Sequence, residues 1–231
     1  HPHCRRQRQM CIRDRFCFVS SKYERELRQV LAGLEKGVNS IIKSCTEIQK
    51  ARMKLIQKRP FLVVRAAGSG IEGSGDLLAL RGDICFPIEV KSSKESKLYL
   101  SGRTVEQYNS LVYEGNRSCL MPLYAYRLKG VRGDSWRILR VKTDTLHGKL
   151  RKLAPLIPSL PLTRNGKPYL NWESGMELNE FIALICSQSD SSKNIEHIQA
   201  RSKVGITLPV KSEQDNYRTR DILAELQKRR I

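Results

Sequence analysis

The sequence has few of the features that support a zinc centre, a disulfide framework or a membrane span. Its seven cysteines stand at positions 4, 11, 17, 45, 85, 119 and 186. This odd count without a C-x-x-C pair favours reduced thiols and argues against structural zinc, and the four histidines are equally dispersed. Because no apolar run of about 18 residues occurs and none follows the basic N-terminus, we expect no membrane span and no signal peptide, and a cytoplasmic protein.

Negative charge is scarce relative to positive charge. The chain has 42 Lys and Arg against 23 Asp and Glu, a formal net charge of +19. Such an excess indicates a polyanionic partner such as nucleic acid, although ribosomal proteins and acidic-lipid binders share it. With 231 residues and 40% hydrophobic content, the chain can form one ordinary domain with extensions.

Composition divides the chain into three parts. Residues 5–14 read like the translation of a sequencing adapter, so residues 1–15 are set apart as not native. Without residues 5–14 the net charge is still +16, so the argument from charge is unaffected. Residues 16–187 carry the patterning of a folded domain, and residues 188–231 form a polar basic tail that is expected to be partly helical.

Two helical segments are predicted at the start of the domain. Leu27, Val30, Leu31 and Leu34 recur at helical spacing, but Gly33 argues against a continuous rod. A second amphipathic segment, an insertion at about 35–59, carries apolar residues among basic ones; they are Ile41, Ile42, Cys45, Ile48, Met53, Leu55 and Ile56. The basic side chains here form either a solvated helix face or a phosphate-contacting surface.

The rest of the domain predicts a sheet with helices. Strands are expected at 60–67, 77–80, 84–92, 120–128 and 136–141, with one helix ending near residue 113 and a closing helix at 176–186. This order of helix, three strands, helix and two strands predicts an α/β fold. Its core is a central mixed β-sheet of about five strands flanked by helices.

Three charged residues stand out in the second and third predicted strands. Asp76 opens one strand, and Glu89 and Lys91 share one face of the next because side chains alternate along a strand. The turn at 81–83 would bring Asp76 and Glu89 together in a hairpin. Their apolar neighbours imply burial, which is costly without compensation. A divalent metal held by both carboxylates would compensate their charge, although an E-x-K pair on a strand is also a common surface feature.

Such a pair of carboxylates is suited to phosphodiester hydrolysis. Mg²⁺ prefers oxygen ligands, and Asp76 and Glu89 would be its main ligands, with the Val90 carbonyl a third. Lys91 could orient the attacking water or stabilise developing charge. The residues by themselves leave two functions open: a metal-dependent nuclease, or a nucleic-acid-binding domain without catalysis.

Several short motifs resemble one nuclease family. They are Glu24-Arg-Glu-Leu27, Val64-Arg-Ala-Ala-Gly-Ser69, Gly75-Asp-Leu-Leu-Ala79, Ile88-Glu-Val-Lys-Ser-Ser93, Leu98-Tyr-Leu100 before the helix with Gln107, and Trp136-Arg137. Together they resemble the archaeal Holliday-junction resolvases of the PD-(D/E)XK nuclease superfamily, with a restriction-endonuclease-like core. The resemblance covers roughly residues 20–187.

This resemblance implies an activity and a set of site residues. It implies a Mg²⁺-dependent homodimeric endonuclease, in which Mn²⁺ can substitute, that cuts four-way DNA junctions. Related alternatives are a restriction or repair nuclease, or a structure-specific nucleic-acid-binding protein. The implied catalytic residues are Glu24, Asp76, Glu89, Lys91 and Ser69, and the implied DNA-binding residues are Arg25, Arg65, Ser69, Ser74 and Gln107.

The chain also departs from the family pattern. Glu24 stands 41 residues before Arg65, so either the segment at about 35–59 is inserted or Glu47 is the glutamate that completes the site. Gly75 stands where the sequences of this family often have proline. A proline at position 87, two residues before Glu89, would remove a hydrogen bond from a central strand.

Overall fold

The computed structural model describes residues 22–66 and 73–187 of the chain. Three predictions fall outside the described residues: the adapter-like segment 1–15, the loop residue Ser69 and the tail 188–231. Within the described ranges, no helix combines the length and the apolar character that a membrane crossing needs.

A six-stranded mixed sheet forms the centre of the domain. Its strands are β1 (Leu62–Arg65), β2 (Leu77–Arg81), β3 (Ile84–Ser93), β5 (Leu123–Leu128), β6 (Trp136–Arg140) and β8 (Met176–Glu177), in the order β1-β2-β3-β5-β6-β8. β3 and β5 run parallel, and the other neighbouring pairs are antiparallel. The helix between β3 and β5 supplies the crossover that a parallel pair requires. The predicted α/β class with a central mixed sheet is confirmed.

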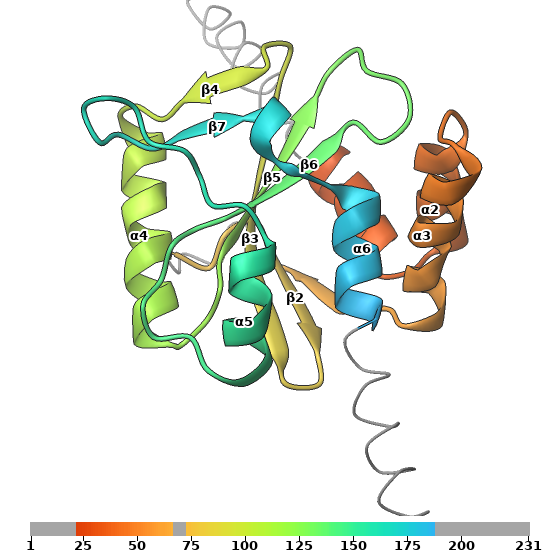
Figure 1. The fold of residues 1–231 in the computed structure, drawn as a ribbon, viewed down its shortest axis with the longest axis horizontal. Coiled ribbons are helices and arrows are strands. Elements are labelled where there is room, and N and C mark those ends of the chain that lie inside the picture. Colours follow the sequence, from red (N-terminus) through yellow and green to blue (C-terminus); the bar gives the residue numbers. More distant parts are fainter. Residues whose placement is uncertain (1–21, 67–72, 188–231) are drawn as a thin grey trace, which may run out of the picture. The chain divides into compact units, whose positions relative to one another are not determined.

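Helices cover both faces of this sheet (Figure 1). They are a helix over residues 22–31, α2 (Glu35–Ile42), α3 (Glu47–Lys58), α4 (Arg103–Arg117), α5 (Gly148–Leu153) and α6 (Leu178–Ser187), with short 3-10 turns at Ala154–Leu156 and Trp172–Ser174. One apolar core lies between the sheet and the helix 22–31, α2, α3, α5 and α6. A second, smaller core lies on the face that α4 covers. Strand residues alternate between the two cores, as the period of a strand requires.

The predicted helix with Leu27 at its centre is shorter than its apolar spacing suggested. Leu27, Val30 and Leu31 are buried, but the helix ends at residue 31 and Gly33 turns the chain with a φ of +67°. Leu34 therefore leaves the apolar face and is 53% exposed, so its assignment to that face was wrong. A glycine with positive φ just after a helix is a common helix terminator.

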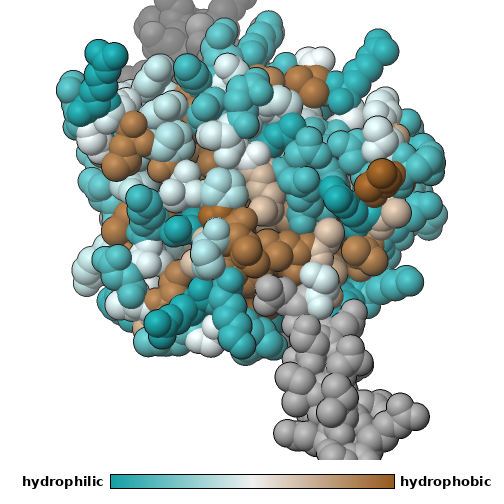
Figure 2. Space-filling view, in the orientation of Figure 1, coloured by the Kyte–Doolittle hydropathy of each residue, from teal (hydrophilic) through white to brown (hydrophobic). Residues whose placement is uncertain are grey.

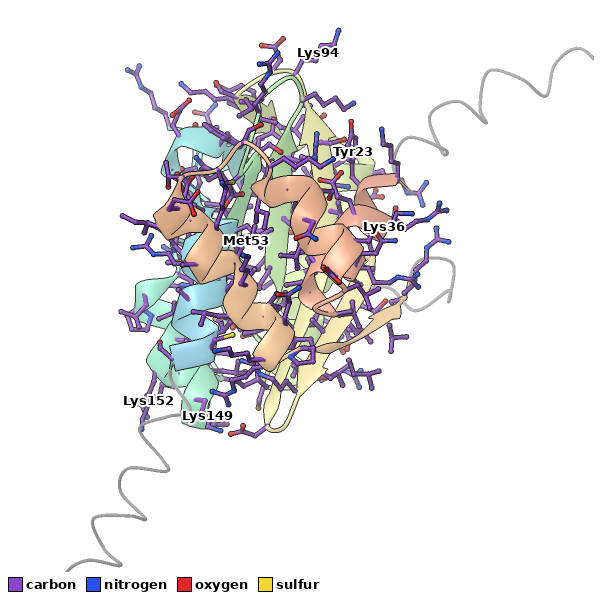
Figure 3. All side chains as sticks on the ribbon, turned by 90° about the vertical axis from the view of Figure 1, so that its right-hand side faces the viewer. Tyr23, Lys36, Met53, Lys94, Lys149 and Lys152 are labelled. Carbon is purple, nitrogen blue, oxygen red and sulfur yellow. The ribbon has the colours of Figure 1, made fainter. Side chains whose placement is uncertain are left out.

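The segment predicted to be a helical insertion contains α2 and α3. α3 begins with a capping box in which Thr46 accepts a hydrogen bond from the N–H of Gln49, and the Gln49 side chain accepts one from Thr46 N–H. Met53 and Ile56 are buried in the core, with Met53 beneath the α3 ribbon in Figure 3. Ile48, which we assigned to the same apolar face, is exposed, because it lies on the first turn of α3 and points away from the core.

The sheet has one strand more than predicted. Met176 and Glu177 form β8 and pair with Ile138 and Arg137 of β6, whereas the sequence pattern placed Met176 at the start of the closing helix. A two-residue strand has no recognisable period, so only its partner strand defines it. A separate two-stranded sheet joins β4 (Lys97–Tyr99) to β7 (Tyr169–Asn171) across more than 70 residues of chain.

Positive charge is spread over the surface of the domain. Figure 3 shows Lys36 and Lys94 projecting outward from different parts of the domain, and Lys149 and Lys152 projecting together from its lower end. The face drawn in Figure 2 is mostly hydrophilic, with hydrophobic residues gathered near its centre. The labelled lysines therefore lie on more than one part of the surface.

The proline in β3 is compatible with its central position. Pro87 pairs with Leu78 of β2, and the parallel pairing of β3 with β5 begins only at Ile88 and Leu123. Pro87, which has no N–H, therefore lies just before the first residue of β3 that pairs with β5. The pairing of β3 with β5 does not lose the hydrogen bond that the sequence suggested it would lose.

Gly75, two residues before β2, provides the first test of this fold. It has a φ of +69°, and a Cβ atom there would lie 2.7 Å from the carbonyl oxygen of Ile88. We expect Gly75→Ala to lower the free energy of unfolding by about 3 kcal/mol, through strain and contact with β3. Gly82 in the β2–β3 turn has a φ of +58° but open space around it, so Gly82→Ala should cost about 1 kcal/mol. Urea denaturation of both variants checks this, and equal losses would contradict it.

Candidate functional site

The β2–β3 hairpin brings Asp76 beside the middle of β3. The backbone N–H of Asp76 donates to the carbonyl of Ile88 (2.9 Å), and the Val90 N–H donates to Oδ2 of Asp76 (2.8 Å). The positive φ of Gly75 allows this close approach, which explains why glycine and not proline precedes Asp76, since proline holds φ near −65°. The Asp76 carboxylate is thus held beside Glu89 and Val90.

Glu89 and Lys91 share one face of β3, as the strand period predicted. Nζ of Lys91 donates to Oε1 of Glu89 (2.8 Å) and to Oε1 of Gln107 on α4 (2.9 Å). Glu89 is 4% exposed, and its neighbours Ile88 and Val90 point into the opposite core. Gln107, for which the family resemblance implies DNA binding, therefore lies at the site and contacts Lys91.

The Glu89 carboxylate is close enough to Asp76 for its charge to raise the pKa of Asp76. Burial, then the charge of Glu89, then that of Glu24 raise the pKa of Asp76 to about 7, against the opposing effects of the Val90 N–H and Lys91. Without a cation, this arrangement disfavours a second negative charge. A bound cation would relieve this repulsion between the two carboxylates.

Glu24 reaches this site from the helix over residues 22–31, and Glu47 does not. Glu24 is 5% exposed, its Oε2 accepts a hydrogen bond from Nε of Arg65 (3.2 Å), and its charge contributes to the raised pKa of Asp76. The side chain of Glu47 is 88% exposed and pairs with Lys50 on the surface of α3. The two helices inserted after Glu24 do not carry it away, because Gly33 lets the chain turn back.

A cavity of about 140 Å³ lies next to Glu24. Its lining residues are Glu24, Arg25, Arg28, Arg65 and Leu77. Three guanidinium groups beside a carboxylate site form a place where a phosphate backbone could bind. Arg25 and Arg65 were predicted to bind DNA, whereas Arg28 was missed, although it follows Arg25 by one helical turn.

The remaining predicted site residues are Ser74 and Val90. Ser74 is partly buried in the turn before β2. Val90 contributes its N–H to Asp76, and the role of its carbonyl as a metal ligand stays a prediction. Tyr124 on β5, which the sequence did not single out, has a fully buried hydroxyl beside Glu89.

The ligands present fit magnesium better than zinc. Among the described residues, no group of three or more His, Cys, Asp and Glu side chains could hold a metal on its own. Mg²⁺ is usually held by one or two carboxylates and completes its coordination with water and substrate phosphates, whereas zinc requires three or four protein ligands. The raised pKa of Asp76 is consistent with a site that a cation completes.

Fold and site together define an α/β protein with paired carboxylates and a lysine on one hairpin of its central sheet. A model of the archaeal Holliday junction resolvase (hjc) family matches residues 48–152. This segment, which contains Asp76, Glu89 and Lys91, is similar to that family, whose members are nucleases. The resemblance suggested by the sequence motifs is thereby confirmed.

Comparisons with solved structures and with curated proteins do not extend this family assignment. A solved structure of Archaeoglobus fulgidus Hjc, a Holliday junction resolvase from an archaeal hyperthermophile, is 24% identical, and the match covers 53% of this chain and 81% of that one. Its TM-score is 0.35, which is too low to support an argument about this fold. The comparison with curated proteins finds no match.

The raised pKa of Asp76 predicts a pH-dependent effect on stability. A carboxyl with a higher pKa in the folded chain binds its proton more tightly there, so stability falls as the pH rises from about 4 to about 7. In chelator, Asp76→Asn should raise the free energy of unfolding by about 1–3 kcal/mol at pH 8 and by much less at pH 5. Thermal or urea unfolding at both pH values measures this.

Asp83, in the turn of the same hairpin, is the matched control. Its exposed carboxylate pairs with Lys149 (2.8 Å), which lowers the pKa of Asp83. Asp83→Asn should therefore give no gain in stability at pH 8. A gain for Asp76→Asn that was independent of pH would contradict the electrostatic explanation.

Proposed function

We propose that this protein is a Mg²⁺-dependent endonuclease that cuts phosphodiester bonds in four-way DNA junctions. The observation that carries the proposal is the convergence of Asp76, Glu89 and Lys91 on the β2–β3 hairpin, within the segment that matches the resolvase family. When bound, Mg²⁺ supplies a water of lowered pKa and neutralises charge on the phosphate. Mn²⁺ should replace it.

Each side chain has a distinct role in this proposal. Asp76 and Glu89 hold the ion, with the Val90 carbonyl a third ligand, and Glu24 completes the negative side of the site. Lys91 pairs with Glu89 in the absence of an ion, and when Glu89 binds the ion the lysine becomes available to orient water or to stabilise the phosphate. Gln107 keeps Lys91 over the site through its Oε1 atom.

The substrate is proposed from the family and from the surface. Arg25, Arg28 and Arg65 line the cavity beside Glu24 and would bind the DNA backbone next to the cleaved bond. Ser69 and Ser74, which precede β2 in the sequence, would add contacts. We also propose a homodimer, because symmetric cutting of a four-way junction requires two sites.

Glu89→Gln tests the catalytic role of the paired carboxylates. The variant keeps the size of the side chain but removes its charge, so cutting of a four-way junction should slow by at least about a thousandfold. Junction binding in a gel-shift assay should stay within a few-fold of the wild type. Glu95→Gln, at an exposed position after β3, is the control and should cut normally. Full activity of Glu89→Gln would refute the assignment.

The same assay on several substrates identifies the preferred DNA. Four-way junctions, linear duplex and flap DNA are compared at equal concentration and salt, because salt alone changes the affinity of every basic protein for DNA. Preference for junctions supports the proposal. Preference for duplex or flap DNA would indicate a restriction or repair nuclease, and binding without Mg²⁺-dependent cutting would indicate a structure-specific binding protein.

Glu24 and Glu47 provide a separate test of which glutamate belongs to the site. Glu24→Gln should slow junction cutting by about 10–100-fold, because Glu24 is buried against Arg65 near Asp76. Glu47→Gln, on the exposed surface of α3, should cut like the wild type. Single-turnover cutting rates of the two variants decide between them, and the opposite result would transfer the role to Glu47.

A further inference from the structure

A buried tyrosine hydroxyl lies on the strand next to the proposed metal ligands. Tyr124 is 0% exposed, and among the described residues its hydroxyl has no hydrogen-bond partner. Tyr126, two residues further along β5 and equally buried, donates its hydroxyl hydrogen to the carbonyl of Glu95 (2.5 Å). The two tyrosines share one face of one strand, and they differ in whether their hydroxyl groups are satisfied.

The position of Tyr124 places it beside Glu89. The two residues are direct partners in the parallel pairing of β3 with β5, so their side chains leave the sheet on the same face. That face is covered by α4, from which Gln107 reaches Lys91. Burial, followed by the charges of Glu89, Tyr108 and Asp76, raises the pKa of Tyr124. The hydroxyl therefore keeps its proton and can act as a donor at neutral pH.

An unsatisfied buried hydroxyl has a cost in stability, and phenylalanine would fill the same space without it. Such a group in a folded protein indicates a functional role or a further hydrogen-bond acceptor close by. Glu89 is the acceptor that the sheet register offers. Oε1 of Glu89 accepts a hydrogen bond from Lys91, so a change in the orientation of Glu89 would alter this pairing.

We propose that Tyr124 is a positioning residue, whose hydroxyl donates a hydrogen bond to the Glu89 carboxylate when Glu89 takes its ion-binding orientation. The inference rests on the proposed function, because it requires a divalent ion at Asp76 and Glu89. A hydrogen bond of this kind fixes the orientation of a ligand side chain and typically changes metal affinity by an order of magnitude. Tyr124 would act through Glu89 and would not contact the DNA.

Tyr124→Phe in the full chain removes only the oxygen atom. Titration calorimetry with Mg²⁺ should give a Kd about tenfold higher than that of the wild type. The Mg²⁺ concentration for half-maximal junction cutting should rise by a similar factor, while the rate at saturating Mg²⁺ stays within about twofold. In chelator, the variant should melt at the same temperature as the wild type or higher, because an unsatisfied buried group is gone.

Tyr126→Phe is the control for the loss of a buried tyrosine hydroxyl. It loses the hydrogen bond to Glu95, so it should melt about 2–4 °C lower and bind Mg²⁺ with the Kd of the wild type. If Tyr124→Phe bound Mg²⁺ as the wild type does, or if it lost melting temperature as Tyr126→Phe does, the positioning role would be refuted and the proposed nuclease function would stand. A wild-type protein that bound no divalent ion would refute the proposed function itself.

Discussion

The paired carboxylates of Asp76 and Glu89 are the constraint on which the arrangement of this domain depends. Two acids held near each other and largely out of water repel, and the pKa of Asp76 rises to about 7 as a result. Two hydrogen bonds offset part of this repulsion. The Val90 N–H donates to the Asp76 carboxylate, and Nζ of Lys91 donates to the Glu89 carboxylate. A site of this kind loses stability without a cation and gains it with one, which links folding to ion binding.

The helix over residues 22–31 brings a third acid, Glu24, near enough to Asp76 for its charge to raise the pKa of Asp76. Glu26 accepts hydrogen bonds from Arg127 and from the Trp136 indole, both 3.0 Å, and so holds this helix against β5 and β6. Buried leucines on the same helix add apolar contact with the core. Glu24 is thereby held beside Arg65 of β1. The α3 helix of the insertion packs mainly against α6.

The two faces of the sheet differ in the side chains that β3 places on them. Ile88 and Val90 of β3 pack into the larger core, while Glu89 and Lys91, between and after them, face α4. The same alternation puts Tyr124 of β5 beside Glu89. The strand period therefore converts one short stretch of sequence into both an apolar support and a polar site. Under the proposed function, the net positive charge of the chain would attract DNA, and a cation between the carboxylates and a phosphate would offset their repulsion.

The sequence by itself determined the elements that repeat with a clear period and the residues that share a strand. The α/β class, the hairpin that joins Asp76 to Glu89, and the common face of Glu89 and Lys91 follow from local spacing, and the structure has all three. Tertiary structure alone decided what depends on contacts between distant segments: the two-residue strand β8, the choice of Glu24 over Glu47 as neighbour of the site, and the unpartnered hydroxyl of Tyr124. The physical reason is that spacing along a chain specifies which way a side chain points, whereas its neighbours are set by packing between segments that may be 40 or more residues apart, as Glu24 and Arg65 are.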